Sequence, residues 1–309
     1  MRDRFIAKLE ELATLNKDIV LVTGDLGFGV FDSFRENLSE QFLNAGVAEQ
    51  NMTGLASGLA LSGKIVFTYS IANFSTLRCL EQIRNDACYH DANVKVVSIG
   101  GGFSYGALGV SHHATEDLAI MRSIPNLLCL APSTLHEAAK ATEAVVDHQG
   151  SCFLRLDKSH GTEEQELLEP FVIGKLRTIR DGGDLTLITC GGILEEVQQA
   201  ADRLKEQHGI QARILSMHTL STMDVEGITR AVEETEHVIT VEEHSIVGGL
   251  GSAVAEVCMD HGLKPRSFNR IALRDGFSSI VGSQNYLRTR YGLDADAIFK
   301  VASQVKGVN

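Results

Sequence analysis

The stretch KIVFTY (64–69) decides the fold class, because it is a short apolar, β-rich run with a helical pattern on each side. The pattern before it covers residues 48–61, the one after it covers 74–89, and a second strand-like run, VKVVSIG, follows at 94–100. Continuous apolar strands that alternate with helices are typical of a parallel sheet covered on both faces. The sequence therefore predicts an α/β fold.

The same alternation fills both halves of the chain, with one interruption. In the first half it continues through DIVLVTG (18–24), NLLCLAP (126–132), LHEAAKATEAVVD (135–147) and CFLRL (152–156). Residues 157–183 are polar and weakly periodic, so we place a domain boundary there. The alternation then restarts at 185–190, 193–207, 211–217, 224–234, 237–243 and 248–260. We expect two doubly wound α/β domains, at about 1–165 and 180–309, the second being smaller.

Composition restricts the class of partner and the compartment. The formal net charge of −12 argues against a general nucleic-acid binder and against an anionic membrane surface as partner. The six cysteines are scattered without a C-x-x-C pair, which indicates reduced core thiols. The N-terminal stretch MRDRFIAKLEELATLN has a helical stripe but no apolar block suited to a signal peptide or a membrane span. We therefore expect a cytoplasmic protein.

Three glycine-rich stretches follow strand-like runs: GDLGFGVF (24–31), GGGFSYGALG (100–109) and VGGLGSAVAE (247–256). None matches a P-loop or dinucleotide fingerprint, so the sequence allows each stretch to form either a tight turn or a ligand-binding loop. The second stretch leads into Ser111, His112 and His113 at a strand's carboxyl end, where open α/β sheets bind ligands. Adjacent side chains in an extended loop point apart, so one imidazole is expected to face a site. Acid/base or oxyanion chemistry suits it better than metal ligation, because no second ligand cluster is apparent.

Five segments together resemble a known family. They are NAGVAEQNM (44–52), FSTLRCLEQIRNDACY (74–89), SHHATEDLAIMRSIPNLLCLAPS (111–133), EEHSIVGGLGSAVAE (242–256) and GSQNYLRTRYGLDADAIF (282–299). In this order they resemble the C-terminal half of transketolases and of 1-deoxyxylulose-5-phosphate synthases, over nearly the whole chain. The similarity is greatest to the small subunit of split bacterial transketolases, which joins a pyrimidine-binding domain to a C-terminal domain.

The resemblance implies a cofactor shared between two chains. Thiamine diphosphate lies at a dimer interface in this family, and a separate partner chain carries the motif that binds the diphosphate and Mg²⁺. This sequence has no G-D-G followed at a distance by N-N, in keeping with a missing half. The resemblance thus implies an α2β2 enzyme that is active only with its partner and has no metal ligands on this chain.

The resemblance also assigns residues. Glu49 matches the glutamate that shares a proton with the pyrimidine N1′, although a first-turn glutamate can simply stabilise a helix N-terminus. Phe74 matches the ring that stacks on the aminopyrimidine, and the alternative role for Phe74 is that of an ordinary core residue. Asp25 matches an acid near the cofactor, or caps a turn. His112 matches the histidine that contacts substrate oxygens and assists proton transfer, and His113 is a second candidate for substrate contact.

Other positions depart from the family pattern. The acidic pair that reads the acceptor's 2-hydroxyl is replaced by Ala107 and Leu108. Three positions that bind the sugar phosphate in the family correspond to Gly100, Gly29 and Lys158. A lysine attracts phosphate as a point charge without the bidentate fork of arginine. We therefore expect an intact cofactor half and a changed acceptor half, with Lys158 and Leu108 beside a nonstandard acceptor that is unphosphorylated or more apolar.

The expected reaction is cleavage of a ketose between C2 and C3 and transfer of the two-carbon ketol unit to an aldehyde. One alternative is the β subunit of a 2-oxo acid dehydrogenase, which would release carbon dioxide and pass an acyl group to a lipoyl domain. A second alternative is a non-catalytic partner subunit that keeps the fold.

Overall fold

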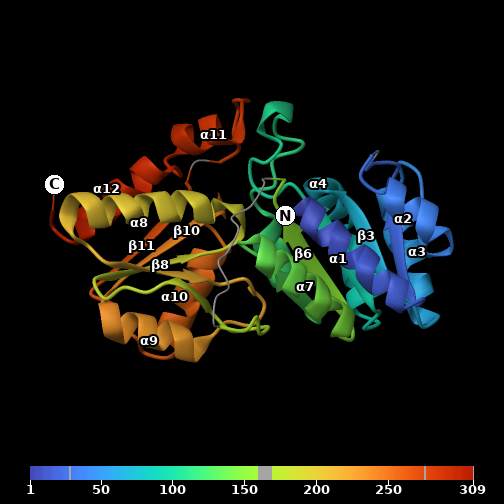
Figure 1. Cartoon of the computed structure of the whole chain (residues 1–309), viewed down its shortest axis with the longest axis horizontal. Helices are drawn as coiled ribbons and strands as arrows, with labels where there is room; N and C mark the ends of the chain where they lie inside the picture. Colours follow the sequence, from blue (N-terminus) through green and yellow to red (C-terminus); the bar gives the residue numbers. More distant parts are fainter. Residues whose placement is uncertain (28, 159–168, 275, 309) are drawn as a thin grey trace.

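The structure, a computed structural model, describes residues 1–27, 29–158, 169–274 and 276–308. Two α/β units lie side by side, the first in blue to green and the second in yellow to red (Figure 1). Each unit contains one sheet between two layers of helices. The α/β fold with two doubly wound sheets that the sequence predicts is confirmed.

The first sheet is parallel and has the strand order β2-β1-β3-β4-β6-β5. Helices α1 and α7 pack together on one face, and α3 and α6 contribute to the core on the other. The strands are β1 (Ile19–Thr23), β2 (Phe42–Asn44), β3 (Ile65–Ile71), β4 (Val94–Ile99), β5 (Leu127–Leu130) and β6 (Ser151–Leu156). The helices are α1 (Arg2–Leu15), α2 (Asp32–Asn37), α3 (Glu49–Leu61), α6 (Asp117–Arg122) and α7 (Leu135–Asp147).

Strand β4 shows why this sheet is covered on both sides. All six of its residues are buried, with Val96 in the cluster around α3 and Val97 in the cluster around α1 and α7. Lys95 is also fully buried, and its ammonium donates to the carbonyls of His148 at 2.8 Å and Gly150 at 2.6 Å. His148 is the C-cap of α7 and Gly150 lies in the turn before β6, so the lysine satisfies carbonyls at the end of the helix and in the turn that follows it.

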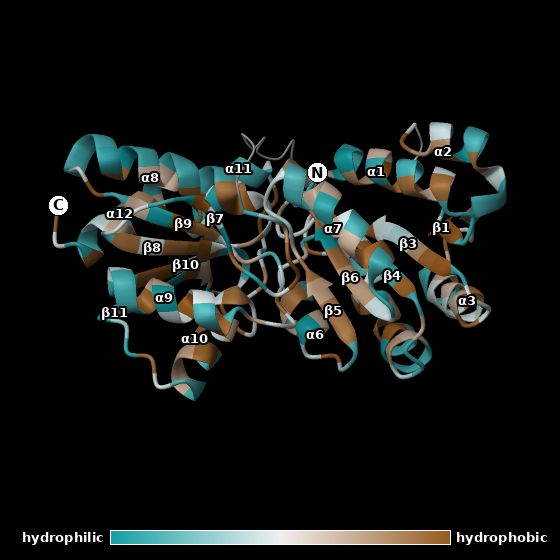
Figure 2. Ribbon diagram, turned by 60° about the horizontal axis from the view of Figure 1, so that its bottom comes forward, coloured by the Kyte–Doolittle hydropathy of each residue, from teal (hydrophilic) through white to brown (hydrophobic). Residues whose placement is uncertain are grey.

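The second sheet has the order β11-β10-β8-β9-β7, and only β7 runs antiparallel to its neighbour. Its strands are β7 (Arg177–Arg180), β8 (Leu185–Thr189), β9 (Ala212–Ser216), β10 (His237–Ser245) and β11 (Ser267–Leu273). Its helices are α8 (Leu194–His208), α9 (Val225–Thr235), α10 (Leu250–Asp260), α11 (Gln284–Tyr291) and α12 (Ala295–Val305). In Figure 2 the central strands of both sheets are largely brown, and the helices around them are mostly teal outside.

The two units share a continuous core. One buried cluster joins Cys129 and Phe153 of the first unit to Ile188 and Met217 of the second. Backbone hydrogen bonds cross between the loops, including Ala131 N–H to the His218 carbonyl at 2.8 Å. Side chains of one unit are therefore held in fixed positions against loops of the other.

In two segments the secondary structure differs from the one that the sequence predicts. The helix expected over 74–89 is broken into α4 (Ala72–Ser75), a 3-10 turn, α5 (Leu80–Gln82) and a π-helical turn at Ile83–Cys88. The boundary segment placed at 157–183 contains strand β7, and its residues 159–168 lie outside the described part of the chain. All six cysteines are buried with free thiols, as expected. None of the helices in the described ranges has both the length and the apolar composition needed to cross a bilayer.

Candidate active site

The carboxyl ends of the strands bring the expected site residues to one edge of the first sheet. Glu49 follows β2, Phe74 follows β3, His112 lies on the loop after β4, and Lys158 follows β6. Since β2, β1, β3, β4 and β6 are adjacent in that order, these residues form a row along this edge. Ligands of open α/β sheets bind at such an edge.

Glu49 is the first residue of α3 and is only 4% exposed. Its Oε2 accepts a hydrogen bond from the Arg78 guanidinium at 2.8 Å, whereas Oε1 accepts none from the described residues. A buried carboxylate with one uncommitted oxygen can share a proton with a ligand nitrogen.

Phe74 and His112 lie edge to face, with their ring centroids 5.1 Å apart. The Arg78 guanidinium carbon lies 4.3 Å from the centroid of the Phe74 ring, so Arg78 contacts both Phe74 and Glu49. The Ser111 hydroxyl lies 3.0 Å from the His112 Nδ1 and fixes one side of the imidazole. Partial burial, with a smaller contribution from His113, lowers the pKa of His112. The imidazole is therefore neutral at pH 7 and can accept a proton.

His113 points the other way and is buried at 4% exposure. Its Nε2 lies 3.1 Å from the Gly106 carbonyl, and its ring packs edge to face on Phe103 with the centroids 5.0 Å apart. The amide of Asn73 donates to the His113 carbonyl at 2.7 Å, which ties the loop to α4. This position does not favour the substrate contact that the sequence suggested for His113, because the ring faces the protein interior.

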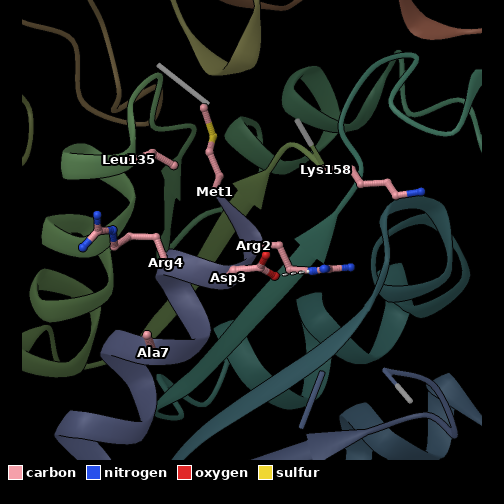
Figure 3. A pocket seen from close by; sticks show the side chains of 7 residues that line it. All are labelled: Met1, Arg2, Asp3, Arg4, Ala7, Leu135 and Lys158. Atoms are coloured by element: carbon pink, nitrogen blue, oxygen red, sulfur yellow. Dashed lines mark hydrogen bonds and ion pairs between the residues drawn. The ribbon is translucent and has the colours of Figure 1, made fainter. Parts of the chain in front are cut away.

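A basic pocket lies beside His112. Lys158 Nζ is 5.0 Å from the Tyr105 ring centroid, which lies 6.2 Å from that of His112. The cavity at Lys158 measures about 530 Å³ and is lined by Met1, Arg2, Asp3, Arg4, Ala7, Leu135 and Lys158. Figure 3 shows the side chains of Arg2 and Lys158 extending in the same direction, while Arg4 points the opposite way. Burial raises the pKa of Tyr105, and the positive charge of Arg2 opposes this shift.

Asp25 and Leu108, two further expected residues, are exposed. Asp25 has a positive φ of 56° and is held by Asn44, whose amide donates to it at 3.0 Å and whose oxygen accepts its N–H at 2.9 Å. Leu108 is 56% exposed on the loop, next to Ala107. Gly100 adopts a φ of 92°, and a side chain there would overlap the Tyr105 ring. The Tyr105 ring thus lies against Gly100, the position for which the resemblance implied a lost phosphate-binding side chain.

Sequence reasoning missed Arg2, Arg78 and Tyr105. Arg78 lies four residues after Phe74 in a quoted segment, a spacing that places two side chains on one face of a helix. Arg2 carried no signal, because its proximity to Lys158 depends on how α1 packs across the sheet. Among the described residues, no group of three or more histidine, cysteine, aspartate or glutamate side chains could hold a metal ion.

Comparison with known proteins agrees with this architecture. Residues 1–163 match the family model described as transketolase, pyrimidine binding domain, and residues 174–298 match the one described as transketolase, C-terminal domain. The chain belongs to the transketolase family. Membership implies dependence on thiamine diphosphate, and the buried Glu49 beside Phe74 fits the pyrimidine half of that cofactor.

Several relatives of this transketolase-family chain are similar along their whole length. It is 38% identical to one of the subunits of the apulose-4-phosphate transketolase of Phocaeicola vulgatus, over 97% of this chain and 96% of the relative. A 6-deoxy-6-sulfo-D-fructose transketolase subunit of a Clostridium species is 34% identical, over 99% and 94% of the two chains. The structure titled "Split gene transketolase, inactive beta4 tetramer" superposes with a TM-score of 0.87 at 33% identity, covering 98% and 97%. By contrast, the chain spans only 47% of the 1-deoxy-D-xylulose-5-phosphate synthase of Desulforudis audaxviator, at 31% identity.

Proposed function

We propose that this chain is the small subunit of a split transketolase, which transfers a two-carbon ketol unit from a ketose to an aldehyde. Support comes from the row of Glu49, Phe74, His112 and Lys158 at the sheet edge. It also comes from a relative, named as a transketolase subunit, that aligns over nearly its whole length with both domains of this chain. We take the first domain to end near 165 and the second to begin near 180.

The cofactor half of the site consists of Glu49, Phe74 and, at its rim, Asp25. When bound, thiamine diphosphate supplies the nucleophilic carbon that takes up the two-carbon unit. Glu49 would hold a proton on the pyrimidine N1′ through its uncommitted Oε1, since Oε2 is engaged by Arg78. The face of Phe74 suits a flat heteroaromatic ring. Burial of Glu49 at 4% exposure excludes water that would otherwise compete for this proton.

The substrate half is formed by the loop after β4. His112 is neutral at pH 7 and can accept the proton of a substrate hydroxyl and return it to the acceptor oxygen. The Ser111 hydroxyl at 3.0 Å from Nδ1 orients the ring, leaving Nε2 for the substrate. Leu108 and Ala107 offer no hydrogen-bond partner to a 2-hydroxyl, so this wall of the acceptor site is apolar.

The basic pocket indicates the acceptor's chemical class. Arg2 and Lys158 line one cavity, in which Arg2 is also paired with Asp3 at 2.8 Å, and the Tyr105 ring lies near both Lys158 and His112. A guanidinium and an ammonium together bind a phosphate or sulfonate group better than the lysine considered alone. The names of two relatives, apulose-4-phosphate and 6-deoxy-6-sulfo-D-fructose transketolases, specify anionic sugars. We therefore propose an anionic aldehyde acceptor, in place of the unphosphorylated or more apolar acceptor that the departures from the family pattern suggested.

The partner would be a chain with the diphosphate-binding domain, which also holds Mg²⁺, in an α2β2 assembly inside the cytoplasm. The structure titled as an inactive beta4 tetramer is of a protein 33% identical to this chain. We expect this chain to be inactive alone, because it would hold only the pyrimidine half of the site and lack the ligands for the diphosphate.

The observation that carries the proposal is the juxtaposition of the buried Glu49 carboxylate with Phe74, Arg78 and His112. The test is co-expression with the chain of a neighbouring reading frame that encodes the G-D-G motif. Ketol transfer and calorimetric binding of thiamine diphosphate are measured with and without that chain. We expect both only in the complex, and micromolar cofactor binding by the isolated chain would contradict the split-enzyme assignment. Carbon dioxide release from a 2-oxo acid would instead support the dehydrogenase alternative.

A further inference from the structure

The loop that carries His112 is held by the second domain. It runs from Gly100 to Glu116 between β4 and α6. Gly102 and Ala114 form an antiparallel bridge at its base, with N–H to carbonyl distances of 2.8 and 2.9 Å in the two directions. The Ser245 N–H at the end of β10 donates to the Thr115 carbonyl at 2.7 Å. His112 lies two residues before Ala114, so this base decides where its ring points.

The glycines of this loop make room for groups of the second domain. A side chain at Gly102, which has a φ of 58°, would overlap the Glu243 carboxylate. A side chain at Gly106 would overlap Leu287 of α11 and the Gly282 carbonyl. The glycine-rich stretch at 100–109 therefore does not cradle a phosphate at Gly102. The anion at this turn is the chain's own Glu243.

Glu243 is 4% exposed and joins the loop to α11. Its Oε1 accepts the N–H of Phe103, and its Oε2 is paired with the Arg288 guanidinium. Gln284 donates to the same carboxylate at 3.0 and 3.2 Å and to the Ser104 hydroxyl at 3.4 Å. Burying two opposite charges is favourable only when geometry and further hydrogen bonds are good, and this carboxylate has several donors.

A second contact path runs from this cluster to His112. The Phe103 ring stacks on Tyr291 of α11 with the centroids 5.5 Å apart, and its edge contacts His113. His113 in turn reaches the Gly106 carbonyl, which also accepts the Gly282 N–H at 3.3 Å. Both ends of the short segment that presents His112 are thus fixed through α11 and β10.

We propose that Glu243 is a positioning residue for His112, so that the second domain acts in the reaction by fixing the loop of the first. This inference rests on the proposed function of His112. It predicts that weakening the Glu243 contacts lowers kcat through His112 while the chain remains folded and assembled.

The adjacent residue Glu242 provides a matched control. It is also fully buried on β10, but its carboxylate accepts the N–H groups of Leu250 at 2.7 Å and Gly251 at 2.8 Å, at the start of α10. Glu242→Gln therefore removes a comparable buried charge without touching the loop. We expect Glu243→Gln to lower kcat by on the order of 10- to 100-fold, the scale of a small misplacement, and Glu242→Gln to leave kcat unchanged.

Two further measurements separate positioning from general destabilisation. In a His112→Ala background, Glu243→Gln should cause little additional loss, because the residue through which it acts is gone. Hydrogen exchange on the isolated chain should show faster exchange at Phe103 and Ala114 in Glu243→Gln, and at the start of α10 in Glu242→Gln. The milder Gln284→Ala should shift the same loop amides if Glu243→Gln folds poorly.

Three outcomes would overturn the inference: an unchanged kcat in a loosened loop, an equal loss in the His112→Ala background, or unchanged exchange at Phe103 and Ala114. Absence of ketol transfer in the wild-type complex would refute the proposed function instead. The exchange experiment would then still decide whether Glu243 anchors the loop, because it needs neither the cofactor nor the partner.

Discussion

Replacing Glu49 by glutamine tests the central assignment, because it should separate activity from stability. The carboxamide keeps the shape and can still accept a hydrogen bond from Arg78, but it cannot share a proton with a pyrimidine nitrogen. The Arg78 side chain is 46% exposed, so solvent screens the ion pair and its loss should cost about 0–1 kcal/mol of unfolding free energy. For a domain of this size that corresponds to a decrease in Tm of at most about 2–4 °C.

The expected loss of activity in Glu49→Gln is far larger. Loss of acid/base catalysis lowers kcat by on the order of 10²- to 10⁴-fold, which corresponds to about 3–5 kcal/mol of transition-state stabilisation. The assays are steady-state ketol transfer by the assembled complex, deuterium exchange at C2 of the cofactor's thiazolium ring, and thermal unfolding. Exchange at C2 should slow in parallel with kcat.

The alternative role of Glu49, a first-turn glutamate that stabilises α3, makes a different prediction. Glu195→Gln is the control, because Glu195 lies in the first turn of α8 and is exposed. If the two substitutions lower Tm similarly and neither changes kcat, Glu49 serves the helix alone. Normal C2 exchange with normal turnover in Glu49→Gln would refute the catalytic assignment.

Four other predictions concern single features. Since the pKa of His112 is lowered, kcat/KM of the complex should fall only as the pH drops through an apparent pKa below about 6.5, and His112→Asn should abolish that limb in a pH-rate profile. Arg2→Met and Lys158→Met should each raise KM for a phosphorylated aldehyde by on the order of 10-fold or more. Neither substitution should change kcat/KM for a neutral aldehyde, and equal effects on both acceptors would refute an anion-binding pocket. The wild-type complex should show nearly equal kcat/KM for ribose 5-phosphate and its 2-deoxy analogue, and Leu108→Asp should shift kcat/KM towards ribose 5-phosphate. A wild-type preference of about a hundredfold or more for ribose 5-phosphate would show that other groups bind the 2-hydroxyl. Burial lowers the pKa of Lys95, so the folded state loses this proton at a lower pH than the unfolded state does. The unfolding free energy should therefore rise with pH between the lowered pKa and about 10.5. Urea titrations of Lys95→Met should show a smaller slope of unfolding free energy against pH, and an unchanged slope would contradict the burial effect.

The type and order of most elements followed from the sequence alone. Helices and buried strands differ in the period of their apolar residues, and that period is a local property of the chain. The runs at 64–69 and 94–100 became the adjacent strands β3 and β4, and the pattern at 135–147 became α7 with the same limits. Glu49, Phe74 and His112 could likewise be selected from short motifs, because each motif keeps its functional residue within a few positions of a strand's carboxyl end.

Local patterns could not predict where helices break or which neighbour of a pair faces the site. The helix expected over 74–89 is interrupted at Thr76, whose ψ of −83° departs from helical geometry next to the buried site. His112 and His113 have the same chemistry, and only the packing of Phe103 on His113 shows which ring is turned inward. Both features depend on contacts with residues distant in sequence.

The tertiary structure alone brought together the charged groups that complete the site. Arg2 and Lys158 are far apart in the sequence of the first domain, and they line one cavity because the start of α1 packs near the end of β6. Glu243 reaches the His112 loop only because the two domains pack with β10 behind that loop. Charge pairing and loop anchoring depend on distances in space, and these distances are set by the order of strands in each sheet and by the packing between the sheets. The period of apolar residues in the sequence does not encode the order of strands.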